Sequence, residues 1–173
     1  MLGIYEHFPD IYHGSALFSS SAPSIEIEKI LLTVLHRLNQ NRENLSLPGF
    51  VWNGIDVEIN VGIADDLTFS YIDEEILHLC LRTLSETVFS TLDFLFIVKY
   101  YVPENGNRKP LRFDYYIVRF TFRTGEVEIL VYHEKGTRRL AVEDLIMFIM
   151  EEVNRELKKR KKPSLKKIHL RAV

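Results

Sequence analysis

The residues best suited to bind a ligand in this sequence are cations concentrated at its C-terminal end. Positions 155–173 hold nine Lys and Arg residues against one acid, Glu156, which gives a net charge of +8. The cations are Arg155, Lys158, Lys159, Arg160, Lys161, Lys162, Lys166, Lys167 and Arg171. A phosphate backbone attracts clustered cations by counterion release, without demanding one fixed geometry. We therefore expect this segment to bind a polyanion, with nucleic acid as the first candidate.

The same cations are also consistent with two roles within the molecule. Lys and Arg near the end of a helix interact favourably with its dipole and keep the surface solvated. The cations could also dock onto the rest of the chain, because residues 1–154 hold 13 Lys and Arg against 23 Asp and Glu, a net charge of −10. This acidic remainder is expected to discourage nonspecific wrapping by a polyanion.

A second basic pair, Arg138 and Arg139, lies just before a predicted helix. Backbone N–H groups at a helix start can hold a phosphate, so both arginines are further candidates for nucleic-acid binding. The order α-βββ-α, which ends with this helix, resembles that of double-stranded RNA-binding domains, a family with basic residues at the same helix start. Glu143 and Asp144, which follow at once, depart from that family.

Side chains that could catalyse a reaction are few and scattered. Cys80, the one cysteine, lies on the apolar stripe of a predicted helix, which indicates a buried core thiol. The six histidines share no metal-ligand spacing, and the sequence has no glycine motif that binds a phosphate or a dinucleotide. We expect no metal, no cofactor and a non-catalytic protein, with an enzyme of unknown class as the third possibility.

The elements that position these residues follow from the apolar periodicity. Helical spacing predicts helices over 24–41, 73–90 and 141–157, the second of them capped by Asp73. Alternating or continuous apolar residues predict strands over 55–63, 67–71, 94–102, 112–123 and 126–134. The order α-ββ-α-βββ-α indicates an α+β protein with a single antiparallel sheet and helices mainly on one face.

Length and composition indicate one domain. The chain has 173 residues, 46% of them hydrophobic, and can bury a sizeable core. We expect residues 1–23 to form an irregular N-terminal arm packed on the body, residues 24–157 a single α+β domain, and residues 158–173 a basic C-terminal tail.

The clearest predicted hairpin turns at Thr124 and Gly125. A two-residue loop pairs Phe122 with Val127, Phe120 with Ile129, Val118 with Val131 and Tyr116 with His133 on one face. The opposite face then pairs Arg123 with Glu126, Thr121 with Glu128, Arg119 with Leu130, Ile117 with Tyr132 and Tyr115 with Glu134. Because that face mixes charge with exposed hydrophobe, we expect the N-terminal arm or a second copy of the protein to cover part of it.

A homodimeric interaction module is the alternative function. Phe148 falls off the apolar stripe of its predicted helix, and the candidate interface combines it with Ile117, Leu130 and Tyr132. The complete order α-ββ-α-βββ-α resembles, by topology only, that of roadblock-like domains, which are small dimerising scaffolds for other proteins. The resemblance implies a protein partner, with the basic tail as a solubilising or docking element.

The sequence also predicts where the protein works. The apolar run from Phe94 to Val98 is stopped by Lys99, and no apolar run approaches the roughly 18 residues needed to span a bilayer, so we expect no membrane association. The start of the chain has no signal-peptide pattern and Cys80 has no disulfide partner, which together favour a cytoplasmic location. Scarce Gln and Cys beside plentiful Glu, Lys and Arg hint at a thermophilic source.

Overall fold

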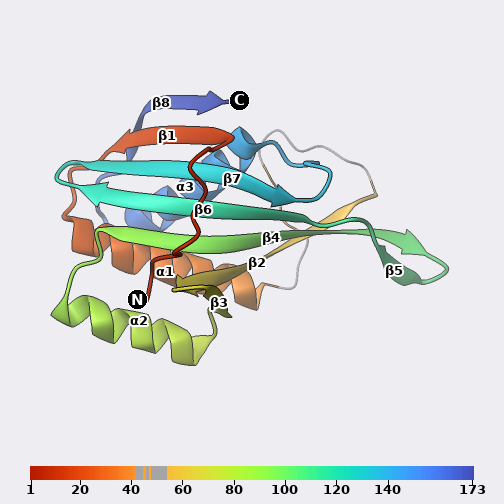
Figure 1. The fold of residues 1–173 in the computed structure, drawn as a ribbon, viewed down its shortest axis with the longest axis horizontal. Helices are drawn as coiled ribbons and strands as arrows, with labels where there is room; N and C mark the ends of the chain where they lie inside the picture. The colour runs from red at the N-terminus through yellow and green to blue at the C-terminus, as the bar shows by residue number, and fades with distance from the viewer. Residues whose placement is uncertain (42–44, 46, 48–53) are drawn as a thin grey trace.

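The computed structural model describes residues 1–41, 45, 47 and 54–173. This part of the chain contains, in order, β1 (Gly14–Ser19), α1 (Ser24–Gln40), β2 (Asp56–Asp65), β3 (Thr68–Tyr71), α2 (Glu74–Glu86), β4 (Thr91–Glu104), β5 (Asn107–Pro110), β6 (Asp114–Arg123), β7 (Glu126–Lys135), α3 (Val142–Lys159) and β8 (Lys166–Ala172). The strands form one sheet in which every pairing is antiparallel (Figure 1). The predicted α+β class with a single antiparallel sheet is confirmed.

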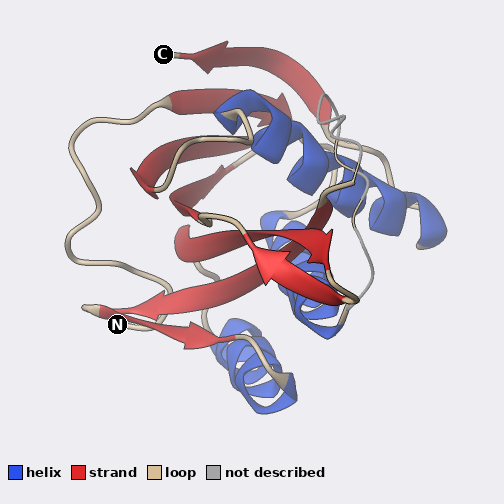
Figure 2. Cartoon of the chain, turned by 90° about the vertical axis from the view of Figure 1, so that its right-hand side faces the viewer, coloured by secondary structure: helices blue, strands red, loops and turns tan. Residues whose placement is uncertain are grey.

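The sheet has helices on one face and an extended segment on the other. Its strands follow the order β3-β2-β4-β6-β7-β1-β8, and β5 pairs with the far end of β4. Helices α1 and α3 lie behind the sheet in Figure 1, and α2 packs against α1. Figure 2 shows the N-terminal arm, residues 1–13, on the opposite side of the sheet from α1 and α3. The sheet therefore has an inner face, which holds the core, and an outer face.

The core fills the space between the inner face and the helices. Its largest fully buried side chains include Tyr100, Tyr116, Phe94, Phe96 and Phe120, which come from the two adjacent central strands β4 and β6. Their alternation with outward-facing residues reflects the two-residue period of a strand. Because β4 and β6 lie in the middle of the sheet, they set the positions of the loops and helices that surround them.

The predicted hairpin between β6 and β7 is largely confirmed. The register matches from Tyr116 with His133 to Arg123 with Glu126. The prediction is wrong at its last pair, because Tyr115 faces Lys135 and not Glu134. The register shifts between Tyr115 and Tyr116, and such an irregularity adds a residue to one strand that a pattern of alternation does not reveal.

Three strands, β1, β5 and β8, lie in segments for which the sequence predicts no regular structure. β1 falls within the predicted irregular arm, and its Gly14, Ala16 and Phe18 alternate into the core. Gly and Ala have small or no apolar side chains, so the alternation of buried and half-buried residues in β1 is hard to recognise in the sequence. β8 occupies part of the predicted basic tail and pairs with β1 along its length. The C-terminal cations are therefore carried partly by a strand of the sheet.

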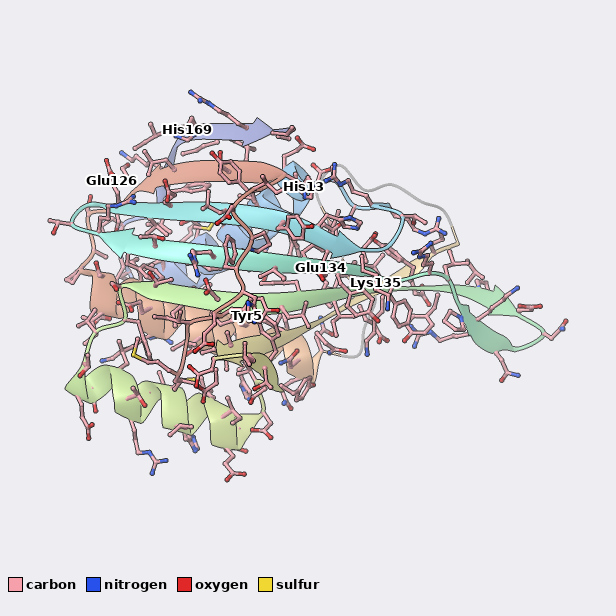
Figure 3. All side chains as sticks on the ribbon, viewed as in Figure 1. Tyr5, His13, Glu126, Glu134, Lys135 and His169 are labelled. Carbon is pink, nitrogen blue, oxygen red and sulfur yellow. The ribbon has the colours of Figure 1, made fainter. Side chains whose placement is uncertain are left out.

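The N-terminal arm crosses the outer face, which was one of the two expected coverings of that face. The Asp93 carboxylate on β4 has no exposed surface and accepts N–H groups of Arg119 at 2.7 and 2.8 Å and of Tyr5 at 2.8 Å. The ring of Phe8 lies 4.2 Å from the guanidinium carbon of Arg119. In Figure 3, Tyr5 lies in front of the middle of the sheet and His13 lies further along, near β1 and β7. The arm thus uses buried charge as well as apolar contact to hold its position.

Candidate polyanion-binding surface

The basic segment begins at the C-terminal end of α3, which closes with a defined turn. Lys161 adopts a φ of 57°, and its N–H donates to the carbonyl of Lys158 at 3.0 Å. The N–H of Lys162 donates to the carbonyl of Leu157 at 2.9 Å. These two bonds and the left-handed residue make a Schellman motif, which satisfies the last helical carbonyls. The chain therefore leaves α3 in a fixed direction.

The segment between α3 and β8 is held by a side chain that the sequence analysis did not single out. The amide of Asn154 accepts the N–H of Leu165 at 2.8 Å and donates to the carbonyl of the same residue at 3.1 Å. Leu165 itself is buried in the core cluster. An Asn inside a helix gives no local signal of such a contact, because its partner is set only by the way the chain turns back.

Three of the predicted cations are engaged in ion pairs within the molecule. Arg155 pairs with Glu152, and Lys162 pairs with Glu26 at 3.5 Å. Arg160 contacts the nearly buried carboxylate of Glu156 at 3.1 Å, and Arg37 of α1 contacts the same carboxylate at 2.9 Å. Hydrogen bonds from Arg37 and then Arg160 hold the pKa of Glu156 below its ordinary value. The pairs of Arg37 and Lys162 link α1 to α3 and the following turn, whereas those of Arg155 and Arg160 are local to α3.

Five lysines remain around this turn, and we call them the basic corner: Lys158, Lys159, Lys161, Lys166 and Lys167. All five are exposed, and none forms an ion pair with a residue that the structure describes. Lys158 and Lys159 end α3, Lys161 lies in the turn that follows, and Lys166 and Lys167 begin β8. The corner therefore holds five positive charges on an ordered part of the fold, and no ion pair with a described residue neutralises them.

Arg171 and Arg138 lie away from the basic corner. Arg171 is near the other end of β8, opposite Ser15 of β1, and Arg138 Nη1 lies 3.5 Å from the carbonyl of Val173. Arg138 and Arg139 precede α3, whose 18 residues span about 27 Å before the corner begins. The structure thus divides the predicted nucleic-acid-binding residues between the two ends of α3.

The backbone N–H groups of Arg138 and Arg139 are occupied by a side chain of the protein. The Asp114 carboxylate accepts the backbone N–H of Arg138 at 2.6 Å and that of Arg139 at 2.8 Å. A carboxylate therefore satisfies these two donors. They precede α3, which begins at Val142, so the expectation that N–H groups at the helix start help to hold a phosphate stays a prediction.

Asp114 is the centre of a buried polar cluster. It also lies 2.6 Å from the Tyr100 hydroxyl, which donates to it, and 2.8 Å from His133 Nε2. Burial, and after it this carboxylate, raise the pKa of Tyr100 far above its ordinary value. Gly136, at a φ of 113°, has no space for a side chain, because a Cβ would collide with Asp114 Oδ1. The cluster fixes the connection from β7 to α3 and has no exposed surface at Asp114, Tyr100 or Tyr116.

The residues predicted to form a dimer interface are largely covered. Phe148 lies off the apolar stripe of its predicted helix, and we therefore expected it to be exposed. In the structure it is only 3% exposed and belongs to the core. Ile117 is 4% exposed on the outer face. The His13 ring stacks on Tyr132 with centroids 4.8 Å apart, and Leu130 is half-buried. The N-terminal arm therefore contacts Tyr132 of this candidate interface, and the core encloses Phe148.

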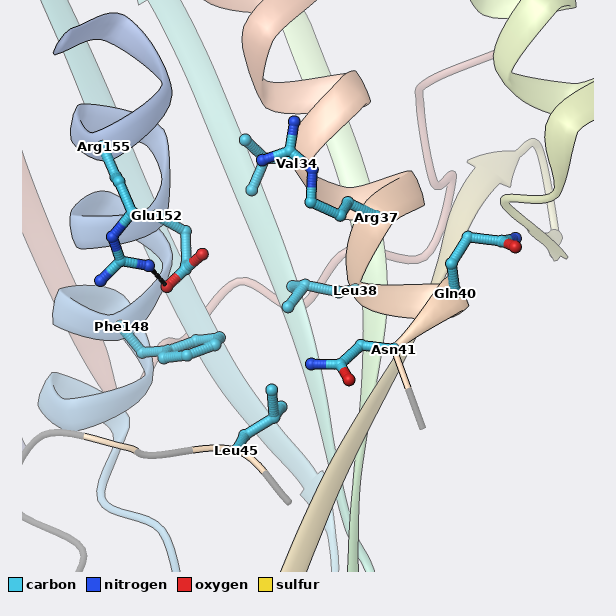
Figure 4. Close-up of a pocket in the computed structure, with 9 residues that line it drawn as sticks. All are labelled: Val34, Arg37, Leu38, Gln40, Asn41, Leu45, Phe148, Glu152 and Arg155. Atoms are coloured by element: carbon cyan, nitrogen blue, oxygen red, sulfur yellow. Dashed lines mark hydrogen bonds and ion pairs between the residues drawn. The ribbon is translucent and has the colours of Figure 1, made fainter. Parts of the chain in front are cut away.

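A groove lies between α1 and α3, next to the start of the basic segment at Arg155 (Figure 4). It encloses about 490 Å³, with Leu38 and Phe148 on its apolar side and Arg37 and Arg155 at its polar side. Both arginines are already paired, Arg37 with Glu156 and Arg155 with Glu152. Figure 4 shows the pair of Arg155 and Glu152 within α3. Neither cation is therefore free to hold an anion in the groove without losing an existing contact.

The described residues show little that would support catalysis. Cys80 is buried, and burial raises the pKa of its thiol to about 11, so the thiol stays protonated near neutral pH. No group of three metal-binding side chains gathers in the part of the chain that the structure describes. Among the helices described, none has both the length and the apolar character required to cross a membrane.

At the level of fold, the chain is an α+β protein with one antiparallel sheet, with α1 and α3 on its inner side and α2 packed against α1, and with a basic corner where α3 meets β8. No protein-family model, curated protein or solved structure matches it.

Proposed function

We propose that the protein binds the phosphate backbone of a nucleic acid through the basic corner. The observation that carries this proposal is the set of five exposed lysines that have no ion-pair partner among the described residues. Bringing like charges together costs free energy unless a counter-charge is present at least part of the time. A phosphate backbone supplies that counter-charge at high density.

The order of the scaffold adds to the proposal. The Schellman motif and the Asn154 contacts fix the turn, and the pairing of β8 with β1 fixes the strand. Cations held in place by the fold lose less freedom on binding than cations on a flexible segment. The corner is therefore better prepared for a rigid polyanion than a free tail of the same composition would be.

The rest of the chain favours binding at one place. Residues 1–154 carry a net charge of −10, which repels phosphate over the body and leaves the C-terminal end as the attractive region. Lysines on β8 also discourage pairing of this edge strand with another chain, and lysines at the end of α3 complement its dipole. Those structural roles are compatible with binding but do not predict it.

The test of this proposal uses substitutions, because deleting the segment would also remove core and sheet contacts. Removal of residues 158–173 takes away buried Leu165 and exposes the edge of β1. The test variant is instead Lys158→Gln, Lys166→Gln and Lys167→Gln together. Its matched control is Arg82→Gln, Lys109→Gln and Arg112→Gln, which removes the same charge from exposed positions on α2 and near the β4–β5 hairpin.

Binding of a fluorescent DNA duplex is measured by anisotropy across a salt series. With five phosphate contacts, the log–log salt slope is about −4.5, and it falls to about −2 when three of them are lost. Raising salt from 50 to 200 mM then weakens binding about 500-fold for the unmodified protein and about 10-fold for the corner variant. The control variant should behave like the unmodified protein. Equal losses in both variants, or no binding by the unmodified protein at low salt, would contradict the proposal.

A further inference from the structure

The basic corner lacks the side chains with which proteins hold unpaired bases. Residues 158–173 contain no Phe, Tyr or Trp, and the ring nearest to the corner in the chain is His169, which is half-buried. Proteins that bind single strands without sequence preference combine cations with exposed aromatic rings, on which the bases stack. Residues 158–173 themselves therefore offer contacts to phosphate and no Phe, Tyr or Trp ring on which a base could stack.

The spacing of the cations also favours a polyanion of high charge density. Lys166 lies at one end of β8, and Arg171, five residues further, is about 16 Å away along the strand. A duplex carries one phosphate charge per about 1.7 Å of its axis, and one of its strands carries one per about 3.4 Å. The same length of axis thus carries about twice as much phosphate charge in a duplex as in one of its strands.

The rigidity of both partners also favours a duplex over a single strand. The corner is fixed by hydrogen bonds at Lys161, Lys162 and Leu165, and a duplex is stiff over about 50 nm. When both surfaces are ordered beforehand, binding costs little conformational entropy, whereas a flexible single strand must be ordered on the protein. We infer that the ligand of the basic corner is the phosphate backbone of a nucleic-acid duplex, bound without base stacking and without sequence preference. This inference rests on the proposed function and narrows it to one class of nucleic acid.

An acidic extended peptide that pairs with the edge strand β8 is the main competitor. Such a peptide would lie along β8 and meet Lys166, Lys167 and Arg171. Lys158, Lys159 and Lys161 lie outside the strand, at the end of α3, and would take no part in that pairing. The distribution of charge across the turn therefore fits a broad phosphate surface better than an added strand.

The experiment compares ligands on the full chain at one salt concentration and then across a salt series. The probes are two DNA duplexes of unrelated sequence, one RNA duplex, single-stranded oligo-dT of equal length, heparin and poly-glutamate. We expect both DNA duplexes to bind alike and at least about tenfold more tightly than oligo-dT, with slopes near −4.5 for duplex and no steeper than about −3.5 for the single strand. The RNA duplex tests whether the inference holds for both kinds of duplex. If its affinity is within about tenfold of the affinity of the DNA duplexes, the result supports the inference for RNA as well as for DNA.

The outcomes separate the two proposals. Oligo-dT binding as tightly as the duplexes, with all of them weakened in the corner variant, overturns the duplex inference and leaves the proposed function standing. Poly-glutamate binding as tightly as the duplexes overturns the inference in favour of an acidic protein partner. If neither heparin nor any nucleic acid binds at low salt, the proposed function fails and the inference fails with it.

Discussion

At the scale of single residues, the most unusual group is the carboxyl of Glu28. This residue lies on α1 with no exposed surface, and neither of its oxygens has a hydrogen-bond partner in the described chain. Burial raises its pKa to about 8, and a weak interaction with the backbone of Phe89 only partly offsets that rise. Glu28 is therefore protonated in the folded protein at neutral pH, at a cost to stability.

Glu28→Gln is expected to stabilise the protein increasingly as pH rises. Below about pH 4.5 the side chain is protonated in both the folded and the unfolded protein, and between about 4.5 and 8 only the unfolded protein loses the proton. The free energy of unfolding should therefore fall by about 1.4 kcal/mol per pH unit in this window, relative to the variant. Urea denaturation from pH 4 to pH 9 measures the difference.

The exposed Glu151→Gln on α3 is the control for this experiment, and its effect should stay within about 0.5 kcal/mol at each pH. A stability difference for Glu28→Gln that does not change with pH would show that Glu28 is not protonated by burial.

Residue-scale predictions from the sequence succeeded where a local pattern decides the environment. Cys80 is buried as its helical stripe predicted, and the Asp73 carboxylate caps α2 by accepting the N–H of Ile76 at 2.8 Å. The role of Asp114 was not predicted, because its partners Tyr100, Arg138 and Arg139 come from distant strands and a loop. Contacts of that kind depend on tertiary structure, which no local spacing encodes.

At the scale of elements, the turn that ends α3 carries a residue that is poorly suited to its conformation. Lys161 has a φ of 57°, and the left-handed conformation costs an ordinary L-residue about 1–2 kcal/mol. Glycine is the usual residue at this position of a Schellman motif. A lysine in this place keeps a cation in the basic corner at some cost in stability.

Lys161→Gly and Lys159→Gly form a matched pair that separates stability from charge. Each removes one lysine of the corner, so both should weaken duplex binding to a similar extent. Lys161→Gly should raise the free energy of unfolding by about 1 kcal/mol, whereas Lys159→Gly at the last residue of α3 should lower it. Urea denaturation tests this, and a loss of stability in Lys161→Gly would contradict the described turn.

The elements themselves could be predicted to different extents. Long amphipathic segments such as α3 and the hairpin of β6 and β7 were predictable, because many residues repeat the same period. β1 and β8 were not, because their alternation is weak and their pairing joins the two ends of the chain. The basic cations were identified from the sequence, but their division between the two ends of α3 required the fold.

At the scale of the whole molecule, the fold concentrates opposite charges in different regions. The chain as a whole has a net charge of −2, yet its last 19 residues carry +8 and the remainder −10. Figure 1 shows β8 at one edge of the sheet, with α3 behind the same part of the molecule. A field of this kind orients an approaching polyanion toward one corner and away from the rest of the surface.

The N-terminal arm limits what the remaining surface can do. It passes over β4, β6 and β7 through contacts at Asp93, Arg119 and Tyr132. An apolar sheet face that would otherwise attract a partner is thereby partly closed. The basic corner is the stronger candidate for interaction because its side chains are exposed.

The most direct test of the central claim is to map the binding surface by NMR. Backbone amide shifts are recorded while a short DNA duplex is added to the full chain at low salt. We predict that the largest changes fall on residues 158–167, that they disappear on raising the salt, and that the β4–β5 hairpin and the outer face do not respond. Changes centred instead on the outer face, the hairpin or the groove between α1 and α3, or no changes at all, would contradict the claim that the basic corner binds a phosphate backbone.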